Sequence, residues 1–483
     1  MADTQSSLDL SNPALTKDRG ITRFLRATEV DTRLLGMIGA LAIIWVGFHF
    51  LTDGTFLTAR NLWNLSVQAS VVAIVATGMV LVIVTRNIDL SVGSVLGVLG
   101  MIMAVIQAEW LPGLLGFEHP MTWLITLVLG IVAGALIGAF QGMWIAYAKV
   151  PAFIVTLGGL LIFRGAAWWT TSGRTVAPLD TNFQVLGGGI AGSIGALWSW
   201  VFGAIAIIGI VIMAVRARQA RKRYDFPTKP IWADVSLTGI AIVGVLAFVT
   251  VMNSYYQPER TVAAAMLDPI IAERDLAGGD LTAISAEARA LVATFPAAVQ
   301  EALADPDVNR RVLVRDLAAW EDLPQIPRGI AVPVLIMLGV AVAMSFMANT
   351  TKFGRYIFAI GGNPEAAELA GVNTKRVIFL IFVMMGVLCA IAGAVQSARL
   401  NAGANATGAL LELSAIAAAV IGGTSLAGGV GTIAGALLGA LVMQSLQSGM
   451  LLLNIDTPLQ NIVIGLVLVF AVWVDTIYQK RRK

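Results

Sequence analysis

Long apolar runs recur along this chain, and they constrain the fold more than any other feature. Each run is about 20 residues long, the length that an α-helix needs to cross about 30 Å of hydrocarbon. A membrane barrel would instead show segments of about 10 residues with alternating polarity. Hydrophobic residues make up 57% of the 483 residues and charged residues only 13%, against about 25% charged in soluble domains. The sequence therefore predicts an all-α polytopic membrane protein.

We predict about twelve transmembrane helices. The expected spans are 34–51, 65–84, 91–107, 121–147, 152–170, 197–215, 235–252, 330–347, 377–396, 413–421, 432–453 and 460–474. The segment 413–421 is too short to cross unaided. If 413–429 re-enters the membrane instead of crossing it, the C-terminus moves to the other side. One span carries a glycine every four residues, which gives it a smooth face for a neighbouring backbone: Gly130, Gly134, Gly138 and Gly142.

Basic residues indicate the orientation of the chain, because they mark cytoplasmic segments. The N-terminal tail 1–33 is basic near its end and has no signal-peptide cleavage pattern, so we expect a retained first span. With twelve crossings, the tail, the basic cluster in 216–229, the segment 349–376 and the basic tail 480–483 all lie on one side. We therefore expect both termini to lie in the cytoplasm.

The apolar spans and the polar segments between them divide the chain into six parts. The expected boundaries are a tail at 1–33, a first membrane part at 34–184, an inserted span pair at 185–252, an acidic insert at 253–328, a second membrane part at 329–479 and a tail at 480–483. The insert holds twelve acidic residues against seven arginines, a net charge of −5. We expect it to be a small periplasmic helical cap. Within it, Asp305 and Pro306 are expected to open a helix in which Val308, Val312, Leu313 and Trp320 recur at helical spacing.

The polar segment 349–376 lies between two apolar spans and contains a helix start signal. Asn363 can accept backbone N–H groups of a first turn, and Pro364 suits the first helical position. Glu365 then favours the positive first turn, and Gly371 can end the helix in the left-handed conformation. The sequence predicts a helix over 364–370. So short a helix is marginal alone in water. From this stretch alone, a capped surface loop and a contact for another protein are equally good readings.

Several enzyme classes are excluded by the residue inventory. The chain has no GxxxxGK[ST] phosphate loop and no GxSxG motif. The two histidines, His49 and His119, lie at a span end and in a loop, and the single cysteine, Cys389, cannot form an intramolecular disulfide. We therefore expect no catalytic site, no metal site, no cofactor bound by this chain and no nucleic-acid partner.

Polar side chains in or beside the apolar segments are candidates for a substrate pathway. They are Asn87, Asp89, Thr156, Arg164, Gln396, Thr424 and Ser425. For Asp89 we favour helix capping over substrate contact, because it directly precedes a span. Arg164 lies deeper, where pathway contact and pairing with a neighbouring helix are equally plausible. Few charges line the spans, which favours a neutral polar solute over an ion-coupled carrier.

Four separated motifs, in order, carry a resemblance to a known family. They are NIDLSVGS at 87–94, VPAFIVTLGGLLIFRG at 150–165, GRYIFAIGGNPEAAELAGVNTKR at 354–376 and AIAAAVIGGTSLAGGVGTIAGALLG at 415–439. Together they resemble the monosaccharide branch of bacterial ABC importer permeases, the ribose and xylose type. The span pair after the fifth span is similar to the xylose-type permeases, so the resemblance implies a ten-helix core with one inserted pair, in a bacterial inner membrane. The long acidic portion from residue 257 departs from that pattern.

The resemblance implies a permease that imports a neutral sugar, xylose or another pentose, by alternating access in a lipid membrane. It implies a second copy of the permease, a periplasmic sugar-binding protein and a cytoplasmic ATPase whose two nucleotide domains carry ATP and Mg. The segment that would contact the ATPase comprises Arg355, Gly361, Gly362, Asn363, Pro364, Glu365, Ala366, Ala367 and Gly371. Two alternatives from other classes are an ion-coupled secondary sugar transporter that needs no ATPase, and a sensor or scaffold that binds ligands through the acidic insert.

Overall fold

The computed structural model describes residues 27–29, 32–189, 192–278, 280–305 and 307–480. The long helices of the main bundle are α2 (Thr32–Leu51), α3 (Ala59–Val84), α4 (Val92–Val105), α6 (Thr122–Ala146), α7 (Ala152–Trp169), α15 (Val332–Thr350), α18 (Thr374–Leu400), α20 (Ile433–Leu452) and α21 (Thr457–Lys480). Shorter elements of the bundle are η1 (Thr55–Leu57), the π-helix η2 (Ile106–Trp110), α5 (Leu111–Leu115), α8 (Thr181–Gln184), η3 (Val185–Gly187), α16 (Lys352–Gly362), α17 (Pro364–Leu369) and α19 (Leu411–Ile421).

The prediction of an all-α membrane protein is confirmed. Among the described residues, ten helices are long and apolar enough to cross a membrane, and α19 and the stretch Thr457–Phe470 are shorter apolar helices. The inserted pair predicted at 197–215 and 235–252 is present as the helices α9 (Gly195–Arg223) and α10 (Ile231–Asn253). The total of twelve crossings stays a prediction.

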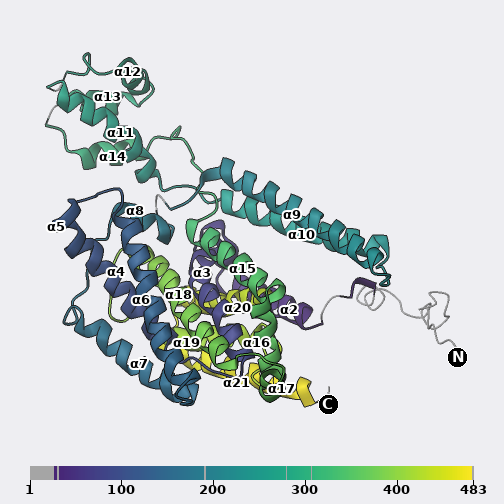
Figure 1. Cartoon of the computed structure of the whole chain (residues 1–483). Coiled ribbons are helices and arrows are strands. Elements are labelled where there is room, and N and C mark those ends of the chain that lie inside the picture. The colour runs from purple at the N-terminus through teal and green to yellow at the C-terminus, as the bar shows by residue number, and fades with distance from the viewer. Residues whose placement is uncertain (1–26, 30–31, 190–191, 279, 306, 481–483) are drawn as a thin grey trace, which may run out of the picture.

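The centre of the bundle is built on α3 and α18, which lie side by side, and α4 packs on α18 (Figure 1). In the most apolar 18-residue stretch of α3, 94% of the residues are buried. The corresponding share is 83% in the continuous helix Val92–Leu115, which begins with α4. The glycine face of α6 packs on α18, as predicted. A methyl group on Gly138 would lie 2.2 Å from the carbonyl oxygen of Phe382, and one on Gly134 would lie 2.4 Å from that of Gly386. Small residues thus let the two backbones touch.

The chain crosses the bundle between α18 and α20 as a loop followed by the short helix α19. Near the end of α18, Gly403 exchanges two backbone hydrogen bonds with Val176, at 3.0 and 2.9 Å. The loop then runs along α4 until Gly408 lies against Gly93. After α19, the backbone N–H of Gly429 donates to the carbonyl of Val84, at the other end of α3, at 2.9 Å. This course favours a crossing over a re-entrant hairpin.

The helices α9 and α10 form a hairpin that projects from the bundle (Figure 1). Only 11% of the most apolar window of each helix is buried. At the far end of the hairpin, Arg221 pairs with Glu29 at 2.7 Å, and the guanidinium holds the pKa of this carboxyl below its usual value. The basic cluster predicted in 216–229 lies in the last turns of α9 and in the connection to α10.

The acidic insert is helical, as predicted, and has a hydrophobic core of its own. Its helices are α11 (Glu259–Leu276), α12 (Ala286–Val292), α13 (Ala297–Leu303) and α14 (Arg310–Ala318). The core includes Leu267, Val299, Leu303, Leu313 and Leu317, each at most 1% exposed. The insert and α17 lie at opposite ends of the molecule (Figure 1).

The predicted start of the last helix in the insert was wrong. The helix begins at Arg310, because the side chain of Asn309 accepts the backbone N–H of Arg311 at 2.8 Å. Asp305 instead stabilises a turn by accepting the N–H of Asp307 at 3.0 Å, and Pro306 lies outside the described residues. Val308 and Trp320 flank the helix and still pack against the core of the insert.

Candidate functional site

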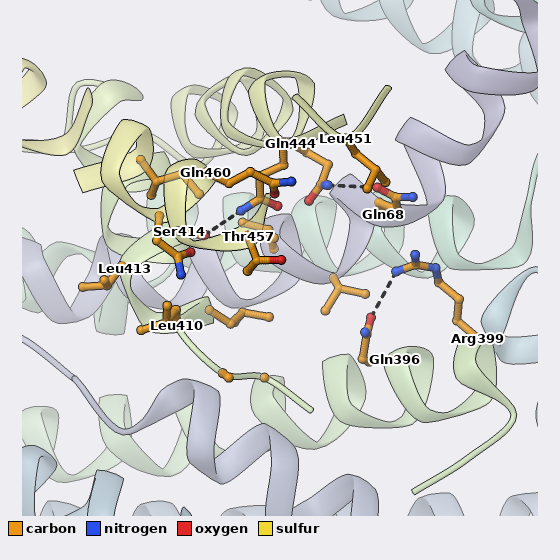
Figure 2. Close-up of a pocket in the computed structure, with 18 residues that line it drawn as sticks. Gln68, Gln396, Arg399, Leu410, Leu413, Ser414, Gln444, Leu451, Thr457 and Gln460 are labelled. Carbon is orange, nitrogen blue, oxygen red and sulfur yellow. Dashed lines mark hydrogen bonds between the residues drawn. The ribbon is translucent and has the colours of Figure 1, made fainter. Parts of the chain in front are cut away.

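A polar cavity of about 390 Å³ lies between α3, α18, α19, α20 and α21 (Figure 2). Most of the polar side chains that line it carry an amide. The polar lining residues are Gln68, Gln396, Arg399, Ser414, Gln444, Gln447, Thr457, Gln460 and Asn461. Apolar residues of α3, α20 and α21, the first residues of α19 and the loop before it complete the wall. The bundle therefore holds a hollow whose polar lining groups are almost entirely neutral.

The amides of the cavity already bond to one another, which fixes their orientation. Gln444 donates from Nε2 to Oε1 of Gln68 at 3.0 Å, and Gln447 donates to the hydroxyl of Ser414 at 3.3 Å. An amide offers donors and an acceptor together. A hydroxyl group also donates and accepts, so this lining is suited to a neutral polyhydroxylated solute. Arg399, whose guanidinium donates to Gln396 at 3.4 Å, is the one charged lining residue.

The cavity lies toward the end of the bundle that is remote from α17. It uses Gln68 from the first half of α3, whereas the last residue of α3, Val84, lies against Gly361, just before α17. It also uses the last part of α18 and the first turns of α21. The cavity and the predicted ATPase contact are therefore separated by about half the length of α3, from Val72 to Val84.

Of the predicted pathway residues, Gln396 lines this cavity, while Asp89 belongs to a packed polar cluster. Asp89 is 2% exposed, and its Oδ1 accepts from the backbone N–H and the hydroxyl of Ser91 at 2.9 and 2.7 Å. Gln141 then donates to the hydroxyl of Ser91 at 2.8 Å. Asp89 is therefore not itself the N-cap residue of α4. Ser91 holds that position, and Asp89 orders the turn that leads into it.

Arg164 and Thr156, both on α7, belong to the same cluster. Arg164 donates from one guanidinium nitrogen to the carbonyls of Asn405 and Thr407, at 3.0 and 3.2 Å. These bonds hold the loop before α19 against α4 and α7. Thr156 donates to the carbonyl of Ala152 at 2.9 Å. We define the packed polar cluster as Asp89, Ser91, Gln141, Thr156, Arg164 and Glu412; Glu412 lies within electrostatic reach of Arg164 and Asp89.

The remaining predicted residues lie at turns. Asn87, in the turn after α3, donates to the carbonyl of Thr85 at 3.1 Å. Thr424 and Ser425 belong to the turn between α19 and α20, where the hydroxyl of Ser425 accepts the N–H of Ala427 at 3.2 Å. None of the three lines the cavity. A role for them in substrate contact stays a prediction.

Sequence reasoning missed most of the amides of the cavity. The signal was present, because Gln444 and Gln447 stand three residues apart on one face of an apolar helix, and Gln460 and Asn461 open the next one. The candidates were single polar residues, and the spacing of amides along a helix face was not used to choose them. Neutral amides are most of the polar residues that line the cavity.

The coupling segment, residues 349–376, contains the predicted short helix. In α17 the side chain of Asn363 accepts the N–H of Ala366 at 3.1 Å, and Pro364 occupies the first helical position. Gly371 has φ 84° and its N–H donates to the carbonyl of Glu368 at 2.9 Å. A second helix, α16, precedes it and was not predicted. Its N-cap is Thr351, whose hydroxyl accepts the N–H of Gly354 at 3.2 Å.

One face of α17 is packed on the protein and the other is open. Ala367 is 5% exposed, and its carbonyl accepts the N–H of Val372 at 3.0 Å, which ties the helix to the chain that follows. Glu365 and Ala366 are exposed, and Leu369 is 90% exposed. A large apolar side chain held out on a capped, anchored helix is suited to a protein partner. Sequence reasoning did not single out Leu369.

Comparisons with known proteins agree with one another. The sequence profile of the family described as "Branched-chain amino acid transport system / permease component" matches residues 61–224 and 235–472. The chain is 35% identical over 453 residues to the xylose transport system permease protein XylH of Haemophilus influenzae, covering 94% of this chain and 98% of that protein. It is 36% identical over 453 residues to XylH of Escherichia coli K12, covering 94% of each.

A more distant similarity is to a permease whose name gives a second sugar. The chain is 29% identical over 420 residues to the ribose import permease protein RbsC of Escherichia coli K12, covering 87% of each chain. No solved structure matches.

Proposed function

Because the chain belongs to this family of transport-system permeases, we propose that it is the membrane subunit of an ATP-driven importer of a monosaccharide. The observation that carries the proposal is the pairing of a neutral, amide-lined cavity with a capped helix at the other end of the bundle. In this proposal α17 binds a separate ATPase, whose movement displaces the helix. The cavity receives the sugar and opens to each side in turn.

The proposed substrate is xylose or another pentose. Two relatives that align over almost the whole chain are named as xylose permeases, and the more distant one as a ribose permease. A neutral sugar also suits the lining, since Gln68, Gln444 and Gln460 offer uncharged donors and acceptors.

The proposed assembly has four kinds of component. They are two copies of this permease, an ATPase with two nucleotide domains that hold ATP and Mg, and a periplasmic sugar-binding protein. Both termini and α17 face the cytoplasm of a bacterium, and the acidic insert faces the periplasm. Exposed Leu369 and Ala366 on α17 support the ATPase contact, because they form an apolar surface on a rigid helix.

Uptake in reconstituted membranes tests the proposal directly. The permease is incorporated in liposomes with its neighbouring ATPase and sugar-binding protein, and uptake of labelled pentoses and hexoses is measured. We expect uptake of a pentose that requires ATP, the ATPase and the binding protein. Uptake by the permease alone, driven by an ion gradient, would overturn the proposal in favour of a secondary transporter.

The role of α17 has its own test. Replacing Ala366 with tryptophan places a bulky side chain on the exposed face, so ATP hydrolysis should continue while uptake falls. Gln184→Ala, in the short helix α8, serves as a control that leaves α17 unchanged. Normal uptake by Ala366→Trp would show that α17 has no coupling role.

A further inference from the structure

Three segments that are far apart in the sequence meet beside α17. They are the end of α3, the joint between α16 and α17, and the turn between α19 and α20. Arg86 lies at the centre of this meeting point. Its Nε donates to the carbonyl of Gly361 at 3.0 Å and its terminal nitrogen donates to the carbonyl of Gly362 at 2.7 Å.

The two carbonyls that Arg86 holds are the last ones of α16. The next residue, Asn363, is the N-cap of α17. A guanidinium at a helix C-terminus satisfies carbonyls that the helix leaves unpaired and lies at the negative end of its dipole. Arg86 itself has φ 62°, so the chain turns sharply after α3 to place this side chain. The contact thus fixes the point at which α17 is hinged to the rest of the protein.

The third segment packs directly against the joint, while the Arg86 side chain itself is exposed. The N–H of Gly429 donates to the carbonyl of Val84 at 2.9 Å, and Gly428 lies against the Arg86 side chain. A methyl group on Gly361 would lie 2.1 Å from the oxygen of Val84 and 2.6 Å from the nitrogen of Gly429. Backbone therefore touches backbone at this joint, and close-packed segments transmit a displacement instead of absorbing it.

The joint is connected to the cavity through α19. The turn at Gly428 and Gly429 comes seven residues after Ile421, the last residue of this eleven-residue helix, and the residues at its start, Leu411, Leu413 and Ser414, line the cavity. A shift of the turn along the helix axis would displace the wall of the cavity. α3 supplies a second connection, because Gln68, Val71 and Val72 belong to the same lining.

We propose that Arg86 is a positioning residue that links α17 to the cavity, by holding the joint of α16 and α17 against α3 and the α19–α20 turn. The proposal rests on the proposed role of α17 as the ATPase contact. When the ATPase moves α17, the Arg86 bonds make the end of α3 and the turn move with it. Without them α17 moves alone, and the cavity does not respond.

The test compares Arg86→Gln with Arg86→Lys and with the control Arg60→Gln in the complete transporter. Arg60 is an exposed arginine at the other end of α3. Sugar uptake and ATP hydrolysis are measured in the same liposomes. We expect Arg86→Gln to lower the sugar transported per ATP by about tenfold, a typical size for coupling between sites. Arg86→Lys keeps the charge but loses the paired geometry, so it should fall between Arg86→Gln and the wild type.

A second readout follows the cavity itself. Leu413→Cys is labelled with an environment-sensitive dye, since the native cysteine, Cys389, is only 1% exposed. ATP binding should change the dye signal in the wild-type background and in Arg60→Gln, but not in Arg86→Gln. If Arg86→Gln keeps the wild-type ratio and dye response, the proposal is overturned. Equal losses of ATP hydrolysis and uptake in both Arg86 variants would also overturn it, because they indicate a merely structural role. Failure of the wild type to use ATP would instead refute the proposed function.

Discussion

Two polar regions lie inside the same apolar bundle, and they differ in what their polar groups bond to. The packed polar cluster contains Asp89 and Arg164, whose bonds go to backbone atoms and to one serine. The cavity contains neutral amides, of which Gln444 and Gln68 bond to each other, around a hollow of about 390 Å³. The charged groups of the cluster bond to the protein, and the amides of the cavity face a hollow.

The difference teaches that burial of charge in a membrane protein does not by itself locate a substrate site. An ionised group in a dry interior needs partners, and the protein supplies them by filling the space around it. Such a group then orders backbone. A neutral amide has a smaller desolvation cost than an ion, so it can face a cavity without a full set of protein partners. The four predictions that follow test this contrast.

The largest effect is expected from the packed polar cluster. Replacing Arg164 with alanine removes the donor for the carbonyls of Asn405 and Thr407 and leaves Glu412 without its nearby cation. Charged hydrogen bonds contribute about 2 kcal/mol, so thermal unfolding in detergent should occur at a clearly lower temperature. Arg174→Ala is the matched control, because its pair with Glu109 is 61% and 36% exposed and is worth less than about 1 kcal/mol. Equal stability of the two variants would break the comparison.

The cavity should show the reverse behaviour. Replacing Gln444 with leucine removes an amide that faces the hollow and bonds to Gln68. We expect the concentration of sugar needed for half-maximal uptake by the reconstituted transporter to rise by about fivefold to tenfold, the size of one hydrogen bond. The unfolding temperature should change little. If Gln444→Leu unfolds at a clearly lower temperature but transports sugar normally, the role of Gln444 is structural.

A smaller effect is expected at Arg399, the charged residue of the cavity. Its guanidinium orients Gln396 at 3.4 Å, a long bond that contributes weakly. Arg399→Gln makes the lining fully neutral, and uptake of a neutral sugar should fall by no more than about threefold. Uptake abolished at wild-type stability would show that a charge, and not the amides, governs the cavity.

The smallest effect concerns carboxylates in the exposed insert. Glu273 accepts the backbone N–H of Ser285 at 2.8 Å, and this bond lowers the pKa of the carboxyl below 4.5. A lowered pKa means that the bond stabilises the fold above pH 4.5 and that this contribution is lost as the pH falls further. Hydrogen exchange at the start of α12 should therefore quicken at acidic pH beyond its intrinsic change. Glu273→Gln should lack the extra change; an identical response of both proteins would refute the prediction.

The fold was predictable from sequence wherever one local signal decided it. Runs of apolar residues identified the long helices, and Asn363 with Pro364 and Gly371 located α17 within one residue of its end. In the insert, Asp305 resembled a helix cap as much as Asn309 did, and the structure uses Asn309. Competing caps a few residues apart cannot be ranked from sequence, because tertiary packing chooses between them.

The site was predictable only in part, since it depends on contacts between distant segments. Gln396 was identified, but its neighbours Gln68 and Gln460 come from helices whose packing the sequence does not state. The joint at Arg86 is a further case. The arginine follows α3, and its partners Gly361 and Gly362 lie 275 and 276 residues away.

The crossing between α18 and α20 has a consequence for how the protein is made. Its first half is a loop, and bare backbone in a loop cannot enter lipid without partners for its polar groups. Those partners include Val176 and Arg164, and both precede the loop in the chain. During synthesis from the N-terminus, the groups that receive this segment are therefore already in the membrane when it emerges from the ribosome.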